Sequence, residues 1–210
     1  MASEKILWIG GWAIPQAYIL DLAKKQFPAF AHVCLLPNSI VLNRKHSEKY
    51  DWVIAYSLGS FLILWQAELF NPRKGIILLA PFLDLKKESG LGGQISVPQL
   101  RYLQKLLREN PVNAINDFYN RAGLDLNCAD SLPYAQEDLE WGIKVLIEHS
   151  ARRDKRTFAQ VIVGEDDPLI NARKLSRFFS GMDIIPGAGH NLKELLPFVA
   201  IKRKSVPHEI

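Results

Sequence analysis

The 210-residue sequence predicts an α/β fold, in which a doubly wound and mostly parallel sheet of about six strands is interrupted by a helical insertion. Two observations support this prediction. Short apolar runs alternate with segments of helical spacing in the first and the last parts of the chain. Between these parts, residues 97–150 show helical spacing and contain no run typical of a strand.

The first part of the chain contains four apolar runs with the length and composition of buried parallel strands. They cover residues 6–9, 32–36, 52–56 and 75–80. A helix is expected from Pro15 to Lys25, and another over residues 61–70. Residues 41–50 are polar and are expected to hold one short helix. Because a crossover segment separates consecutive runs, the strands are expected to run parallel.

The character of the sequence changes after Pro81. Residues 89–93 are rich in glycine and predict a flexible loop, and three amphipathic stripes follow between residues 97 and 150. We interpret residues 84–154 as a helical cap inserted into a core that is formed by residues 1–83 and 155–210. An ordinary two-helix connection between strands is the alternative interpretation.

The sheet is predicted to resume after the insertion. Residues 159–163 and 182–185 have the apolar composition of strands, and helices are expected over residues 171–179 and 192–201. Each of these two strands is followed by a polar or glycine-rich loop. In doubly wound folds such loops lie at the carboxyl edge of the sheet, where ligands bind.

Composition limits the classes of protein that the chain can represent. A hydrophobic content of 48% and a charged content of 23% are typical of a globular core, and no apolar run approaches the ~18–20 residues of a membrane span. Two distant cysteines build no disulfide framework and no metal-ligand spacing, so a reducing compartment, the cytoplasm, is expected, with no convincing signal peptide.

The net charge of +4 is modest, and basic residues cluster at 152–156 and 202–204. We interpret these clusters as solvated surface, with a docking patch for an acidic partner as the alternative. Nucleic acid is not expected as a partner, because no aromatic residues interleave with the basic ones.

The segment Ala55-Tyr56-Ser57-Leu58-Gly59 has the physical features of a nucleophile elbow. A predicted strand ends at a serine, small residues flank the serine, and a predicted helix follows. The usual pattern is G-x-S-x-G, so alanine replaces the first glycine here. The elbow predicts that Ser57 is a nucleophile, whereas the structural alternative is an ordinary tight turn between strand and helix.

A serine hydroxyl stays protonated at neutral pH, so it needs a base, and that base needs an orienting acid. His190 lies in a glycine-rich loop directly after a predicted strand, and Asp167 follows another, with Asp166 as its neighbour and rival. Each of these residues has a structural alternative as a cap or turn residue. Because Ser57, Asp167 and His190 each follow a separate strand of one parallel sheet, we predict a catalytic triad.

These motifs identify the chain as similar to the α/β-hydrolases. The matching segments are residues 6–13, 55–59, 164–170 and 187–190. The family's Gly-x-x-Asp register implies Asp167 rather than Asp166 as the acid. The resemblance also implies an oxyanion hole formed by the amides of Leu58 and Trp12. The chain starts at the strand that is third in the full family fold, so the first hairpin is expected to be missing.

Within the family, the Gly-Trp-Ala loop, the Tyr-Ser-Leu-Gly elbow and the helical cap are similar to carboxylesterases of biotin synthesis. Those enzymes hydrolyse pimeloyl-[acyl-carrier protein] methyl ester, and arginines of their caps meet the acidic carrier protein. No motif aligns those arginines one by one with this sequence. The candidates here are Arg101, Arg108, Arg121, Arg152, Arg153 and Arg156.

The sequence therefore predicts a serine carboxylesterase that acts on a small acyl ester through an acyl-enzyme, with an acyl-carrier protein as a candidate partner. No cofactor and no metal are expected, no membrane is expected as a partner, and a monomer is expected. A thioesterase or acyltransferase with the same triad is the first alternative. A non-catalytic binding protein with the same fold is the second, favoured by Ala55 and by the shortened sheet.

Overall fold

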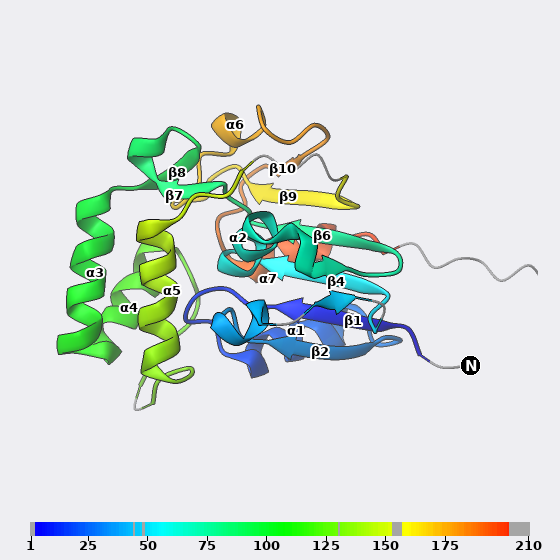
Figure 1. Cartoon of the computed structure of the whole chain (residues 1–210), viewed down its shortest axis with the longest axis horizontal. Helices are drawn as coiled ribbons and strands as arrows, with labels where there is room; N and C mark the ends of the chain where they lie inside the picture. Colours follow the sequence, from blue (N-terminus) through cyan, green and yellow to red (C-terminus); the bar gives the residue numbers. More distant parts are fainter. Residues whose placement is uncertain (1–2, 44, 48, 130, 153–156, 202–210) are drawn as a thin grey trace, which may run out of the picture.

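The computed structural model describes residues 3–43, 45–47, 49–129, 131–152 and 157–201. Within these residues, six parallel strands form the central sheet in the order β10-β9-β6-β4-β1-β2 (Figure 1). The strands are β1 (Lys5–Ile9), β2 (Ala31–Leu35), β4 (Trp52–Tyr56), β6 (Gly75–Leu79), β9 (Gln160–Gly164) and β10 (Asp183–Ile185). The prediction of a doubly wound parallel sheet is confirmed.

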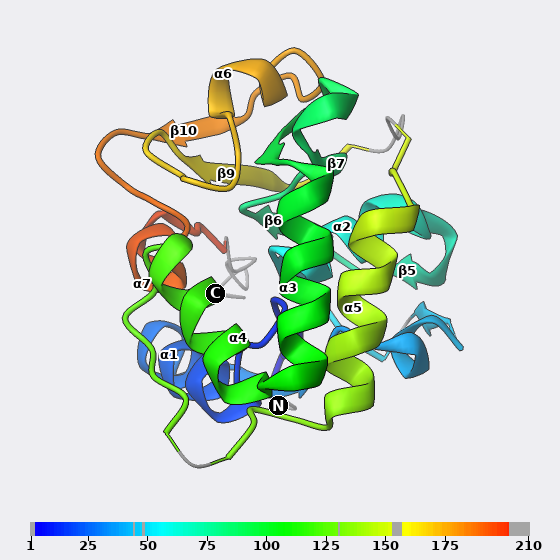
Figure 2. The same cartoon turned by 90° about the vertical axis from the view of Figure 1, so that its left-hand side faces the viewer.

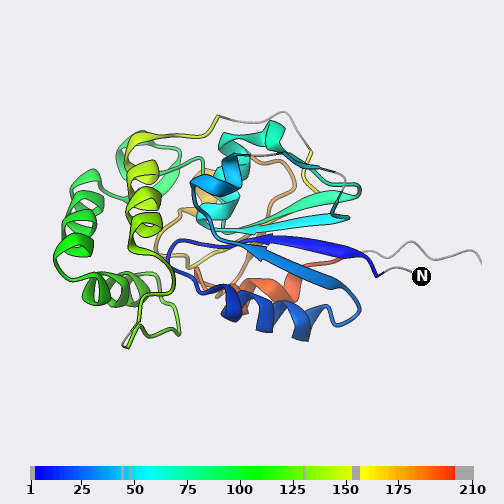
Figure 3. The same cartoon turned by 60° about the horizontal axis from the view of Figure 1, so that its bottom comes forward.

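Helices cover both faces of this sheet, which explains why its central strands are continuous apolar runs. Helix α1 (Gln16–Gln26) and helix α7 (Leu192–Leu195) lie on one face, and α2 (Leu58–Trp65) lies on the other (Figure 3). All five residues of β4 are buried, as are four of the five in β1. Burial of these side chains between helix layers is the main source of the free energy that stabilises the fold.

Several helices are shorter than the sequence pattern predicts. Helix α2 ends at Trp65, and a 3₁₀ turn (η2, Ala67–Leu69) and the two-residue strand β5 (Phe70–Asn71) replace its expected end. The closing helix is replaced after α7 by the 3₁₀ turn η4 (Leu196–Phe198), because Pro197 offers no amide for a continuing α-helix. Helix α6 covers only Ala172–Leu175.

The polar segment 41–50 also differs from the prediction. A 3₁₀ turn (η1, Ser39–Leu42) includes only its first two residues, and the short strand β3 (His46–Ser47) pairs with β5 in parallel. The His46 ring stacks on Phe70 with a centroid distance of 5.4 Å. This contact with a fully buried aromatic ring ties the segment to the core and favours an extended backbone over a helix.

A second small sheet replaces the flexible loop that the glycines of residues 89–93 predict. Strand β7 (Asp84–Lys86) pairs with β8 (Gly92–Ile95), and the turn η3 (Lys87–Ser89) connects them. A Cβ atom on Gly93 would lie 2.1 Å from the carbonyl oxygen of Leu85. The glycine therefore permits a close approach of two backbones rather than a loose loop.

Three helices of the insertion confirm the predicted amphipathic stripes. They are α3 (Val97–Glu109), α4 (Pro111–Arg121) and α5 (Gln136–Glu148), and they form a layer over the carboxyl ends of the strands (Figures 1 and 2). Ser96 and Gln99 form a reciprocal capping box at the start of α3. The Asn110 side chain accepts a hydrogen bond from the Asn113 amide and starts α4.

The two chain segments that enter and leave this helical layer lie side by side. The Ser150 hydroxyl donates to Asp84 over 2.5 Å, and the Ala151 amide donates to the carbonyl of Leu83 over 2.7 Å. The Lys86 ammonium lies 3.1 Å from the same buried carboxylate. This arrangement is typical of an insertion whose ends return to one place; the proposed boundary at 154/155 lies outside the described residues.

Other predictions also lie partly outside the described residues. Arg153, Arg156 and the basic cluster at 202–204 belong to them. Among the helices that the structure does describe, none is long and apolar enough to cross a membrane. The described histidines, cysteines and acidic residues form no group of three that is able to hold a metal ion.

The central strands are expected to dominate stability. Ile54 is fully buried in β4, so Ile54→Ala is predicted to lower the free energy of unfolding by about 2–5 kcal/mol. The matched control is Ile40→Ala, because Ile40 is 63% exposed and the same truncation there should change stability by less than about 0.5 kcal/mol. Urea unfolding of the two variants measures both values; equal effects would contradict this account of the core.

Candidate active site

Ser57 lies at the sharp turn between β4 and α2 and has backbone angles of φ 53° and ψ −115°. An L-residue with this backbone stores roughly 1–3 kcal/mol of strain, which the surrounding structure must hold in place. The Ser57 amide donates to the carbonyl of Leu79 in β6 over 2.9 Å. The first turn of α2 is held in place by the Gly59 amide, which donates to the carbonyl of Gly10 over 3.0 Å.

The flanking small residues have separate roles in this turn. A Cβ atom on Gly59 would lie 2.3 Å from the carbonyl oxygen of Ile9, so only glycine fits against the end of β1. Ala55 is fully buried in β4, and the hydroxyl of Ser60 donates to its carbonyl over 2.8 Å. The fold thus accommodates the methyl group that replaces the first glycine of the elbow pattern.

His190 and Asp167 reach Ser57 from two other strand ends. His190 follows β10 and Asp167 follows β9. All three residues are almost completely buried, with exposed fractions of 1% for His190, 3% for Asp167 and 6% for Ser57. The His190 Nε2 atom lies 2.9 Å from the Ser57 hydroxyl oxygen, and its Nδ1 atom lies 2.7 Å from Asp167 Oδ2. The three side chains form one continuous hydrogen-bonded chain.

The chemistry of these three side chains defines which atom donates and which accepts in each of the two hydrogen bonds. An ionised carboxylate only accepts, so Asp167 is satisfied when His190 carries its proton on Nδ1. Nε2 is then an acceptor for the Ser57 hydroxyl proton. The second oxygen of Asp167 accepts from the amides of Leu169 and Ile170 over 2.8 and 3.1 Å, which fixes the carboxylate. Asp166, its sequence neighbour, is exposed.

Close backbone contacts align the loops that carry the acid and the base. A Cβ atom on Gly164 would lie 2.2 Å from the carbonyl oxygen of Ala188, so glycine at this position lets the two loops touch. The Tyr56 hydroxyl donates to the carbonyl of His190 over 2.7 Å. Burial raises the pKa of Tyr56, and the charge of Asp167 raises it further, so this hydroxyl remains a donor.

The amides of Leu58 and Trp12 lie on two segments that meet beside Ser57, at the start of α2 and in the loop after β1. Leu58 is the first residue of α2, where helix geometry leaves the amide without an acceptor in its own helix. Trp12 lies in the loop that follows β1. Neither amide donates a hydrogen bond within the part of the chain that the structure describes. Both are available to stabilise negative charge on a ligand oxygen.

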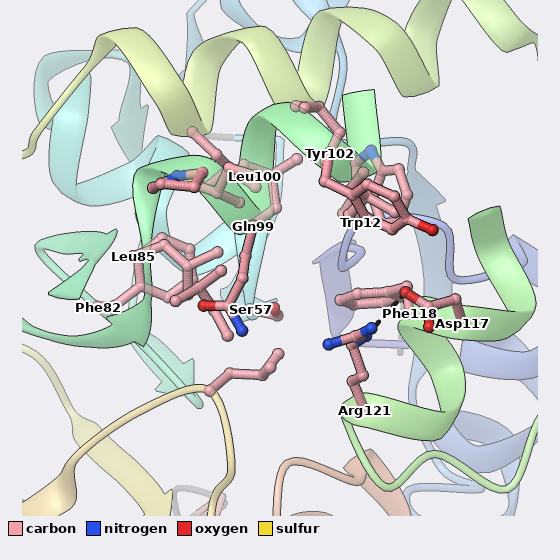
Figure 4. Close-up of a pocket in the computed structure, with 17 residues that line it drawn as sticks. Trp12, Ser57, Phe82, Leu85, Gln99, Leu100, Tyr102, Asp117, Phe118 and Arg121 are labelled. Atoms are coloured by element: carbon pink, nitrogen blue, oxygen red, sulfur yellow. Dashed lines mark hydrogen bonds and ion pairs between the residues drawn. The ribbon is translucent and has the colours of Figure 1, made fainter. Parts of the chain in front are cut away.

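Ser57 opens into a cavity of about 280 Å³ between the sheet and the helical layer (Figure 4). Its lining is mostly apolar and comes from the core and from α3, α4 and α5. The apolar residues include Phe82, Leu85, Leu100, Leu103, Phe118, Ile143, Leu146 and Leu169. Polar side chains enter at Gln99, Asp117 and Arg121, and the last two form an ion pair of 2.8 Å. The cavity suits an acyl chain with its carbonyl at Ser57.

The structure brings together all five residues that the sequence singled out, namely Trp12, Ser57, Leu58, Asp167 and His190 (Figure 4 labels Trp12 and Ser57). Sequence reasoning missed the Tyr56 hydroxyl, although its position directly before the serine was visible. It also missed the Gln94 side chain, which donates to the carbonyl of Asp167 over 3.0 Å from β8. That contact depends on the small sheet, which the sequence did not predict.

Comparison with solved structures establishes the fold class as the α/β-hydrolase fold. The chain is similar to BioG from Haemophilus influenzae (TM-score 0.57, 14% identity, 90% of this chain and 89% of that one). It is also similar to an esterase from Exiguobacterium antarcticum, with a TM-score of 0.68 and 10% identity over 90% of this chain and 85% of that one. A thermophilic esterase from Thermogutta terrifontis has a TM-score of 0.61 and 12% identity over 93% of this chain and 84% of that one. No protein-family model and no curated protein sequence matches the chain.

Gly59→Ala tests the contact between the elbow and β1. The new methyl group would overlap a backbone carbonyl that cannot move, so we expect a loss of about 3 kcal/mol or more in the free energy of unfolding. The control is Gly123→Ala, where φ is +65° but no atom lies within 4 Å of the new Cβ atom; it should cost about 1–2 kcal/mol. Thermal unfolding of both variants decides, and a Gly59→Ala variant as stable as the control would refute the contact.

Proposed function

We propose that the protein is a serine carboxylesterase that hydrolyses an acyl ester through a covalent acyl-enzyme. The observation that carries this proposal is the hydrogen-bonded chain of Ser57, His190 and Asp167 at the base of an apolar cavity. An activated serine next to two free amides is suited to acyl transfer. The similar structures described as esterases agree with this class of reaction.

In the proposed reaction, the Ser57 oxygen attacks the ester carbonyl as His190 Nε2 takes the hydroxyl proton. Asp167 orients the imidazole and stabilises its positive charge. The negative charge on the former carbonyl oxygen is stabilised by the amides of Trp12 and Leu58. Collapse of this intermediate breaks the bond to the alcohol, which leaves with the proton from His190.

The acyl group then remains on Ser57 with its chain in the apolar cavity. Water loses a proton to His190 and attacks the acyl carbonyl, and the second tetrahedral intermediate releases the carboxylic acid and restores the Ser57 hydroxyl. A thioester would pass through the same acyl-enzyme, and another nucleophile in place of water would give an acyltransferase. These alternatives differ in the leaving group or the acceptor, not in the triad.

The first test is labelling of the protein with a fluorophosphonate, which reacts with activated serines. We expect one label for each wild-type molecule and none for Ser57→Ala or His190→Ala, because the first lacks the nucleophile and the second lacks the base. Mass spectrometry measures the stoichiometry. A folded wild-type protein that takes up no label would refute the catalytic proposal and would favour a binding protein with this fold.

The acid is tested by two neighbouring substitutions of the same kind. Asp167→Asn removes the buried carboxylate that accepts from His190 and should lower kcat for a p-nitrophenyl ester by roughly 10³–10⁴-fold. Asp166→Asn changes an exposed carboxylate and should leave kcat within about twofold. Comparable losses in both variants would contradict the assignment of Asp167. Parallel assays with an acyl thioester of equal chain length separate esterase from thioesterase activity.

The candidate substrate is pimeloyl-[acyl-carrier protein] methyl ester, with the helical layer as the docking site for the acidic carrier protein. Arg101, Lys105 and Arg108 follow one another at helical spacing along α3 and are exposed. Lys105 and Arg108 also form ion pairs with acidic neighbours, of 3.7 and 3.5 Å, respectively. Arg121 adds an exposed guanidinium at the cavity lining.

This partner predicts a charge effect that depends on the substrate. The double variant Arg101→Glu/Arg108→Glu should lower kcat/KM for the carrier-bound methyl ester at least several-fold, with a larger effect at low salt than at high salt. The same variant should hydrolyse a free methyl ester as the wild type does. The control is Lys24→Glu/Lys25→Glu on α1, at exposed positions away from the helical layer. Equal losses for free and carrier-bound esters would contradict the docking site.

A further inference from the structure

Three hydrogen bonds join the loop after β1 to α4, to α5 and to the segment that connects these two helices. They involve Trp12 and Ala13, the residues on which one half of the proposed oxyanion hole depends. Their partners, Tyr119, Tyr134 and Leu139, lie more than 100 positions further along the chain. The triad and the cavity do not by themselves require such contacts.

Two of the three hydrogen bonds restrain the backbone of Ala13, one through its amide and the other through its carbonyl. The Ala13 amide donates to the Tyr134 hydroxyl over 2.7 Å, and the Ala13 carbonyl accepts from the Tyr119 hydroxyl over 2.5 Å. Burial raises the pKa of both tyrosines, so both hydroxyls stay protonated. Ala13 has φ 59°, a left-handed conformation that costs an alanine about 1–2 kcal/mol and needs such support.

The third bond fixes the side chain of the neighbouring residue. The Trp12 indole donates to the carbonyl of Leu139 over 2.8 Å, and the ring meets Phe118 edge to face with a centroid distance of 4.8 Å. A Cβ atom at Gly142 would lie 2.6 Å from the indole, so the absence of a side chain there makes room for it. Trp12 is therefore held from α4 and α5 while its amide remains free for a ligand.

The occupied Ala13 amide also limits which group of this loop binds an oxyanion. Because this amide already donates to Tyr134, it is not available to a substrate oxygen. The peptide plane between Trp12 and Ala13 is fixed at its amide end by that bond, and the Trp12 amide lies one peptide earlier. The contacts with Tyr134 and Tyr119 therefore restrain the backbone directly after the Trp12 amide.

We propose that Tyr119 and Tyr134 are positioning residues that hold the Trp12 amide in the geometry that stabilises the transition state. This proposal rests on the proposed serine hydrolase function. It makes the helical layer part of the catalytic apparatus as well as the wall of the acyl cavity. Preorganised donors lower the barrier because they need no reorientation when charge develops, so loosening them lowers kcat without weakening ground-state binding.

The test compares Tyr119→Phe and Tyr134→Phe, which remove one oxygen each and keep the packed ring. With a p-nitrophenyl acyl ester as substrate, kcat/KM should fall at least tenfold in each variant, and by no more than the roughly 10²–10³-fold that loss of a complete oxyanion donor causes. The matched control is Tyr50→Phe, because Tyr50 precedes β4 at the opposite edge of the sheet and should retain wild-type activity.

Two ketone inhibitors separate a positioning role from a merely structural one. An alkyl trifluoromethyl ketone forms a hemiketal oxyanion on Ser57, whereas the methyl ketone of equal chain length binds as a trigonal ground-state analogue. We expect the inhibition constant of the trifluoromethyl ketone to rise by the same factor by which kcat/KM falls, and that of the methyl ketone to stay within twofold. A cavity disturbed by the substitution would weaken both inhibitors alike.

The outcomes distinguish this proposal from the function on which it rests. A wild-type protein without esterase or thioesterase activity and without fluorophosphonate labelling would refute the function itself. An active wild type with unchanged kcat/KM in both tyrosine variants would overturn the positioning role alone. An equal rise in the inhibition constants of the two ketones would also overturn it, because the loss of activity would then come from a change in the shape of the cavity. Thermal unfolding confirms that each variant folds before its kinetics are interpreted.

Discussion

The close contact between the elbow and the end of β1 is the constraint on which the rest of the site depends. The strained backbone of Ser57 persists because Gly59 packs directly against the carbonyl of Ile9 and donates to that of Gly10. The same contact places the loop after β1 next to Ser57, the candidate nucleophile. A single approach of two backbones thereby orients the serine hydroxyl and sets the distance between the two candidate oxyanion donors. Both consequences follow from the absence of one side chain.

The parallel sheet supplies the remaining groups because its strands end at one edge. Asp167 and His190 follow adjacent strands, β9 and β10. Because Gly164 packs against the carbonyl of Ala188, the loops that carry the two side chains are in contact. The resulting carboxylate and imidazole are almost fully buried, which removes water that would compete for their hydrogen bonds. Tyr56, directly before the nucleophile, links the serine strand to the histidine loop through one hydroxyl. The proposed triad is thus formed by three loops that short backbone contacts hold together.

The apolar runs, and the positions of Ser57, an aspartate and His190 after separate strands, were sufficient to predict the parallel sheet, the helices between residues 97 and 150 and the side chains that meet at the edge of the sheet. The choice of Asp167 over Asp166 and the two candidate amides rested on the resemblance to the α/β-hydrolases. A strand buried on both faces must be apolar throughout, and a parallel sheet must place successive strand ends together, so both features leave strong local signals. The ends of helices left weaker signals, since Pro197 was compatible with a longer helix by spacing alone. The small sheet of β7 and β8 left none, because a strand that contains Gly92 and Gly93 has the composition of a loop.

The contacts of Tyr119 and Tyr134 with Ala13 were beyond sequence reasoning for a different physical reason. They depend on how the helical layer folds back over a loop that lies more than 100 positions earlier, and no local spacing encodes that distance. Their effect is to tie the polar half of the site to the apolar half. The helices that line the acyl cavity with Phe118 also restrain Trp12, so a displacement of this layer changes the cavity and the direction of the Trp12 amide together. Substrate that packs well against the helices would thereby favour the arrangement in which the amide is correctly placed, since binding energy from the acyl chain is then available to the transition state.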